Sequence, residues 1–124
     1  MKRDFRLPAI ALAVLACDAS VRLDKYATGV STSRATCVTA LKDYTGRPPA
    51  TSERLVVLRA RSGSSARQLD AIKTEAAREG ATGILLGRPE DSAGLPTADQ
   101  GETWATALLV AADSGLVHSA CDSH

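Results

Sequence analysis

Three residues of metal-binding type lie within seven positions near the end of the chain. His118, Cys121 and His124 follow one another at intervals of three. Imidazole nitrogen and thiolate sulfur are good ligands for zinc and copper, so a metal-handling role is one hypothesis for this chain. The spacing is not that of a standard zinc signature, and a disulfide at Cys121 would remove its thiolate. We therefore expect neither a resident metal nor another cofactor.

The residue types and spacings that catalysis requires are not found together in this chain. Both histidines of the chain lie in this last segment, and no Gly-x-Ser-x-Gly elbow is present. The adjacent acids Glu90 and Asp91 lie in a polar loop, where carboxylates usually face solvent. Gly80, Gly83 and Gly87 follow the predicted helix, whereas a phosphate-binding loop precedes one. We predict no catalytic residues and a protein that is not an enzyme.

The cysteines point to a compartment. Cys17, Cys37 and Cys121 make an odd count, which is awkward in an oxidising environment. If Cys17 is modified, Cys37 and Cys121 remain as a pair that would oxidise in the bacterial periplasm if geometry allows. Their loop of roughly 85 residues would contribute on the order of 4 kcal/mol in the chain-entropy model. The alternative is two unpaired, buried thiols.

The first sixteen residues have the layout of an export signal. Lys2, Arg3 and Arg6 form a basic tip before an apolar run from Leu7 to Ala16. A run of about ten residues fits a signal peptide and is shorter than the ~20 residues that span a bilayer as a helix. We predict a signal peptide over residues 1–16; the alternative is a buried N-terminal helix.

The end of this run resembles the lipobox of bacterial lipoproteins. In Val14-Leu15-Ala16-Cys17, the small residue before the cysteine fits, while Leu15 is bulkier than the usual Ala or Ser. The resemblance implies cleavage before Cys17, fatty acids such as palmitate on Cys17, and a membrane anchor facing the periplasm. Val14 and Ala16 also satisfy the rule for ordinary signal peptidase, and cleavage after Ala19 is possible. The alternative is therefore a soluble periplasmic or secreted binding protein.

Composition excludes one class of partner. Removing residues 1–16 takes away three of the 15 basic and one of the 14 acidic residues, so the net charge falls from +1 to near −1. Tyr26, Tyr44 and Trp104 are then the remaining aromatic residues, too few for a base-stacking platform. Without a basic footprint, nucleic-acid binding is not expected.

Hydrophobic periodicity predicts a small single domain of the α+β or α/β class. The apolar segments Arg54–Ala60, Thr82–Leu86 and Thr103–Ala111 read as strands, and Ala35–Leu41 as a further strand carrying Cys37. A helix is expected from an N-cap at Ser65 to about Glu79. The expected architecture is a β-α-β unit with additional strands, giving a three- to four-stranded sheet with one main helix packed on one face.

The segments around these elements are expected to be linkers and loops. Residues 17–35 are expected to be the lipidated cysteine and a tether, with a short strand possible near Ser20–Leu23. Residues 36–124 form the predicted domain, which ends in a flexible tail from Val117. Residues 43–52 and 87–102 are expected to be loops, because both are rich in Gly and Pro. The long second loop could contact a partner or be a disordered connection.

The helix and its exit resemble those of small proteobacterial envelope lipoproteins of unknown function. The stretch from Ile72 to Leu86, followed by a strand like Thr103–Ala111, carries the resemblance. A distant likeness to the stress-sensor lipoproteins of the Rcs phosphorelay covers about Leu55 to Ala112. Those sensors have cysteines in the strand region after the helix and in the final strand, where this chain has none. The resemblance implies an envelope lipoprotein that acts on an unidentified envelope protein partner, and it does not imply a signalling role.

Overall fold

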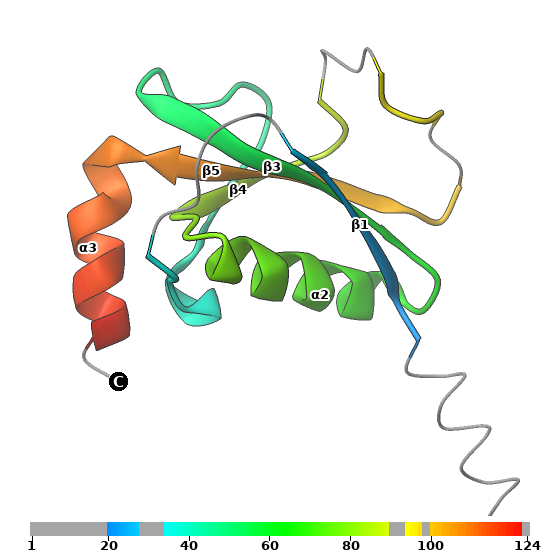
Figure 1. The fold of residues 1–124 in the computed structure, drawn as a ribbon, viewed down its shortest axis with the longest axis horizontal. Helices are drawn as coiled ribbons and strands as arrows, with labels where there is room; N and C mark the ends of the chain where they lie inside the picture. The colour runs from blue at the N-terminus through cyan, green and yellow to red at the C-terminus, as the bar shows by residue number, and fades with distance from the viewer. Residues whose placement is uncertain (1–19, 28–33, 90–93, 98–99, 123–124) are drawn as a thin grey trace, which may run out of the picture.

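The computed structural model describes residues 20–27, 34–89, 94–97 and 100–122. Within them the chain forms a single α+β domain with a five-stranded mixed sheet and two α-helices (Figure 1). The elements in chain order are β1 (Arg22–Ala27), the 3-10 helix η1 (Val38–Ala40), β2 (Lys42–Tyr44), β3 (Ser52–Arg61), α2 (Ser65–Arg78), β4 (Gly83–Leu86), β5 (Thr103–Val110) and α3 (Ala111–Asp122).

The strand order is β1-β3-β5-β4-β2. β3 pairs antiparallel with both β1 and β5, and β5 pairs antiparallel with β4. β3 and β4 are consequently parallel to each other, but β5 lies between them. The expected β-α-β unit is therefore present in a split form, with β5 between its two strands. β2 then adds to the far side of β4 as a parallel edge strand.

α2 packs on one face of this sheet, as expected (Figure 1). Its N-cap is Ser64 rather than Ser65, because the Ser64 side chain accepts a hydrogen bond from the Arg67 backbone at 3.2 Å. Ile72 and Ala76 are fully buried against β3, β4 and β5. Ala105 and Ala107 of β5 are also fully buried, and these small side chains allow the helix to approach the sheet closely.

Three segments differ from expectation. Cys37 is an extended residue outside the sheet, directly before η1, so Ala35–Leu41 is not a strand. β1 overlaps the short strand considered near Ser20–Leu23 but continues to Ala27 and pairs along its whole length with β3, so part of the predicted tether belongs to the sheet. Residues 42–44, which overlap the start of the loop expected over residues 43–52, form β2. Pairing of β2 requires Gly83, since a Cβ there would lie 2.6 Å from the Tyr44 ring and 3.0 Å from the Lys42 carbonyl oxygen.

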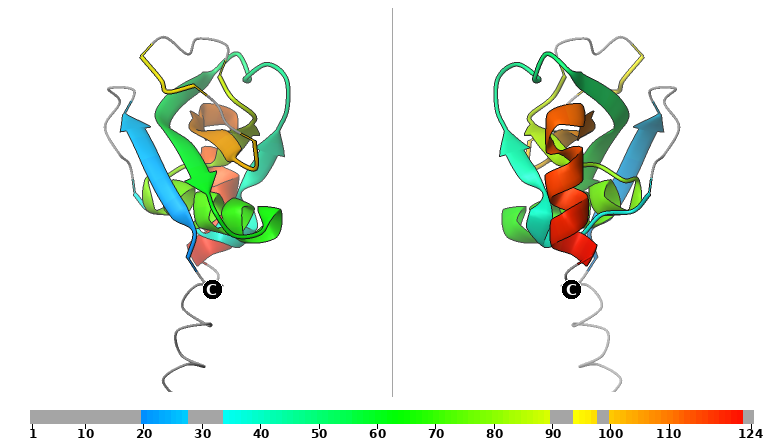
Figure 2. Two further views of the ribbon diagram at one scale, coloured as in Figure 1. Left: turned by 90° about the vertical axis from the view of Figure 1, so that its right-hand side faces the viewer. Right: turned by 90° about the vertical axis from the view of Figure 1, so that its left-hand side faces the viewer.

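The C-terminal segment is a helix rather than a flexible tail. α3 follows β5 directly and lies at the end of the sheet (Figure 2), across the strand direction (Figure 1). Its sequence has little amphipathic pattern, and Gly115 lowers its helix propensity, so local signals for it are weak. Contacts with distant parts of the chain hold it instead: Asp113 with β2, Cys121 with Cys37, and Asp122 with Arg34.

The predicted signal peptide and the proposed lipidation site at Cys17 lie outside the described residues. In the described part of the chain, no helix combines the length and the apolarity needed to cross a membrane.

Candidate functional site

The structure joins Cys37 and Cys121 in a disulfide. Their Cα atoms are 5.5 Å apart, although the residues are 84 positions apart in the chain. Cys37 precedes η1, and Cys121 lies in the last turn of α3, so the bond fixes the end of α3 to the segment beside α2. The expected pair is therefore present, and the alternative of two unpaired thiols is not.

The disulfide changes the proposed metal constellation. The sulfur of Cys121 is bonded to Cys37 and offers no thiolate while oxidised. His118 Nδ1 lies 3.3 Å from Ser114 Oγ, one turn earlier in α3, and His124 lies outside the described residues. Within the described ranges, no group of three or more His, Cys, Asp or Glu residues is placed to hold an ion.

A second connection fixes the start of α3 to the edge strand β2. Asp113 is buried and accepts hydrogen bonds from Lys42 Nζ at 2.8 Å and from the Tyr44 hydroxyl. The hydrogen bond from Lys42, followed by that from Tyr44, lowers the pKa of Asp113. The hydrogen bond to Asp113, together with burial, raises the pKa of Tyr44 to about 12. This network stabilises the edge of the sheet that carries the pocket described below.

Replacement of Tyr44 by Phe is expected to lower the free energy of unfolding by about 1 kcal/mol at neutral pH, the usual worth of a hydrogen bond. Because the pKa of Tyr44 is raised in the folded state, its contribution is complete below pH 10 and is lost as the pH rises toward 12. Titration of tyrosinate absorbance should show a step near pH 12 that Tyr44→Phe removes and the matched variant Tyr26→Phe retains. A late step that survives in Tyr44→Phe would contradict the assignment.

An aromatic cluster lies on the face of the sheet opposite α2. Trp104 stacks on Tyr26, with ring centroids 5.9 Å apart, and its indole N–H donates to Glu102 Oε2 at 3.0 Å. Arg59, the cross-strand neighbour of Trp104, donates from Nε to Glu102 Oε1 at 2.8 Å. The guanidinium carbons of Arg59 and Arg88 lie 5.4 and 4.5 Å from the indole centroid, within cation–π range. The cluster thus holds Arg88 close to the sheet.

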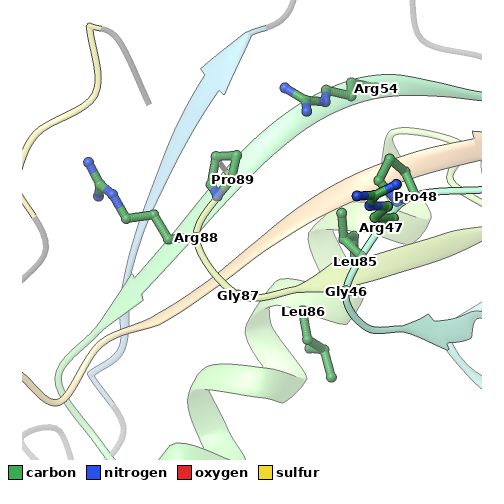
Figure 3. Close-up of a pocket in the computed structure, with 9 residues that line it drawn as sticks. All are labelled: Gly46, Arg47, Pro48, Arg54, Leu85, Leu86, Gly87, Arg88 and Pro89. Carbon is green, nitrogen blue, oxygen red and sulfur yellow. The ribbon is translucent and has the colours of Figure 1, made fainter. Parts of the chain in front are cut away.

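Beside this cluster the sheet carries an arginine-lined pocket, with about 410 Å³ of empty volume that is partly open to solvent. It lies between the turn after β2, the turn after β4 and Arg54 of β3 (Figure 3). Among the described residues that line it, none is acidic. Its lining residues are Gly46, Arg47, Pro48, Arg54, Leu85, Leu86, Gly87, Arg88 and Pro89.

The two turns have the same sequence. Gly-Arg-Pro occurs at residues 46–48 and again at residues 87–89. β2 and β4 are parallel neighbours in which Tyr44 pairs with Leu85, so the two copies follow their strands at equivalent positions. Both glycines have positive φ, +78° for Gly46 and +103° for Gly87, a conformation that glycine adopts without a steric penalty. Both turns therefore leave the sheet through a glycine with positive φ.

Sequence reasoning did not identify this pocket. The repeated tripeptide is visible in the chain, but its meaning depends on parallel pairing of β2 with β4, and β2 has three residues. The acids Glu90 and Asp91, considered as a catalytic pair, lie outside the described residues.

The comparisons with known proteins leave the family open. No protein-family model matches the chain, and no curated protein matches it. Among solved structures, the chain is similar to the crystal structure of a Francisella virulence factor, FvfA, in the orthorhombic form. The similarity has a TM-score of 0.44 and 13% sequence identity, and it covers 73% of this chain and 98% of that one. A likeness at this level carries no argument about function.

Proposed function

We propose that the protein is an exported bacterial envelope lipoprotein, anchored through Cys17, that acts through protein contacts rather than catalysis. The observation that carries this proposal is the disulfide between Cys37 and Cys121. Stable disulfides form in oxidising compartments such as the periplasm and are rare in the cytosol of most bacteria. With these two cysteines joined, Cys17 is the remaining one of three, at the position where the lipobox-like sequence has its modified cysteine.

The proposed anchor also sets an orientation. Cys17 precedes Ser20, the first described residue, by three positions, which an extended chain spans in at most about 11 Å. A lipid on Cys17 would therefore hold the beginning of β1 next to the membrane. In Figure 1 the chain enters β1 at the lower right, whereas the turns after β2 and β4 lie above the sheet. This arrangement leaves the arginine-lined pocket accessible to an envelope protein.

Replacement of Cys17 by Ala tests the anchor. In a bacterial host that processes lipoproteins, the wild-type chain is expected in the membrane fraction, and Cys17→Ala in the soluble periplasmic fraction or as an uncleaved precursor. The matched control is the double variant Cys37→Ala with Cys121→Ala, which removes the disulfide and keeps Cys17. This control should remain in the membrane fraction.

Two outcomes would overturn the proposal in different ways. A wild-type chain found soluble in the periplasm would favour the alternative of a soluble binding protein with the same fold. A chain that stays in the cytosol with reduced cysteines would reject export altogether. The metal-handling hypothesis would regain support if the reduced protein bound zinc or copper through His118 and Cys121.

A further inference from the structure

We propose that the paired Gly-Arg-Pro turns and Arg54 form a docking site for an acidic segment of a protein partner. The inference rests on the proposed function to the extent that both invoke a protein contact. It adds the location of that contact and the chemistry of the partner. The first observation is the pocket's position at the carboxyl ends of two adjacent parallel strands. The turns that follow two adjacent parallel strands leave the sheet at the same edge, so one ligand can contact both turns.

Charge is the second observation. Arg47, Arg54 and Arg88 line the pocket, and no described lining residue has a negative charge. Arg88 Nη1 is buried and has no hydrogen-bond partner among the described residues. The hydrogen-bonding capacity of this nitrogen is therefore unused, and a carboxylate would gain a charge-assisted hydrogen bond there once a small shift of the Arg88 side chain exposed it. Arginine suits this role because its guanidinium group can donate two parallel hydrogen bonds to one carboxylate.

The directions of the three side chains distinguish an extended ligand from a small ion. Figure 3 shows Arg47 beside Pro48, Arg54 on β3, and Arg88 on the other side of Pro89. Arg88 is held in this direction by its contact with Trp104. In Figure 3 the three guanidinium groups do not converge on one point, and that of Arg88 points away from Arg47, so the arrangement favours a ligand with several separated charges over a single phosphate ion. A chain with several carboxylates can reach Arg47 and Arg88 at the same time.

The floor of the pocket provides an apolar contact between these charges. Leu85 is 8% exposed and packs with Leu108 and Val110 in the smaller hydrophobic cluster of the sheet. Pro48 and Pro89 complete the apolar lining. Proline also restricts the backbone of each turn, which lowers the entropy cost of ordering the turns on binding. The ligand that fits best is therefore an acidic peptide segment with an apolar side chain between its carboxylates.

Trp104 provides an intrinsic signal for the test. It is the single tryptophan of the chain, and Arg88 lies against its ring. The experiment titrates the purified full chain in detergent with the peptide Glu-Asp-Leu-Asp-Glu and with its uncharged counterpart Gln-Asn-Leu-Asn-Gln. We expect the acidic peptide to change Trp104 fluorescence in a saturable manner and to bind at least tenfold more tightly than the amide peptide. Added salt should weaken this binding.

Variants assign the binding to the pocket. Arg47 is exposed, so Arg47→Gln should retain the fold. This variant should weaken binding of the acidic peptide about fivefold, the upper range for loss of an exposed ion pair. Arg88→Lys keeps the charge but loses the paired donors, and it should weaken binding by a similar factor. Arg22→Gln makes the same change of charge as Arg47→Gln at an exposed position on β1, and it should leave the affinity unchanged.

Equal affinity for the acidic and amide peptides would overturn the proposal, as would unchanged affinity in both pocket variants. Displacement of the peptide by an equal concentration of inorganic phosphate would reassign the pocket to a small oxyanion. These measurements use the purified chain whether or not it carries lipid. Their failure is therefore separate from failure of the proposed membrane anchor.

Discussion

Removal of the disulfide between Cys37 and Cys121 is expected to lower the free energy of unfolding by about 4 kcal/mol. The two residues are 84 positions apart, and a cross-link over such a loop removes much of the entropy of the unfolded chain. The bond also holds the last turn of α3, whose own sequence has weak helical signals. Its loss should therefore expose α3 to proteolysis before the sheet unfolds.

Urea unfolding of the wild type and of Cys37→Ala with Cys121→Ala measures this effect. Reductant should destabilise the wild type to about the level of the double variant and should leave the double variant unchanged. If the oxidised wild type and the double variant unfold at the same urea concentration, the disulfide does not stabilise the fold.

Replacement of Glu102 by Gln is expected to have the second largest effect on stability and to cost more than the loss of an exposed ion pair, because it removes the nearest carboxylate from an arginine with a largely covered side chain. The side chains of Arg59 and Glu102 are 8% and 3% exposed, and they form a salt bridge that is reinforced by the hydrogen bond from Arg59 Nε. Formation of this ion pair raises the pKa of Arg59. Without the Glu102 carboxylate, Arg59 loses its nearest acceptor and keeps the longer ion pair of its Nη1 with Asp24 Oδ2, at 3.9 Å, and its contact with Trp104. Loss of the Glu102 acceptor also weakens the position of the Trp104 ring.

Two matched variants separate burial from charge. Glu79→Gln removes the carboxylate of an exposed pair with Lys25, whose Nζ lies 3.4 Å away, and should cost less than 1 kcal/mol. Arg59→Met combined with Glu102→Leu replaces the buried pair by apolar groups and should recover much of the lost stability. A Glu102→Gln variant as stable as Glu79→Gln in thermal unfolding would show that the pair is not buried in solution.

Local patterns predicted the central elements of the fold. β3, α2, β4 and β5 have strong signals, because each repeats apolar residues over several positions, and the first three end at a Gly or at a turn. The order of the strands could not be read from these patterns. Insertion of β5 between β3 and β4 depends on which strand edges are available after α2 has crossed the sheet, and this property belongs to the whole domain.

α3 and the arginine-lined pocket could not be predicted from local sequence patterns either. Residues 111–122 become helical because Asp113, Cys121 and Asp122 find partners far away in the chain, and no short window of sequence contains those partners. The two Gly-Arg-Pro copies are 41 residues apart and become neighbours through β2, a strand too short to predict. The disulfide was predictable, since cysteine count and compartment limit the pairing without reference to the fold.

The mass of the N-terminal peptide of the wild-type protein, isolated from bacterial cells, tests the central claim most directly. The account predicts a mature chain that begins at Cys17 and carries the added mass of a lipid, with Cys37 and Cys121 joined in the same molecule. A chain that begins at Cys17 without lipid, begins after Ala19 or retains Met1 would contradict the proposed lipoprotein.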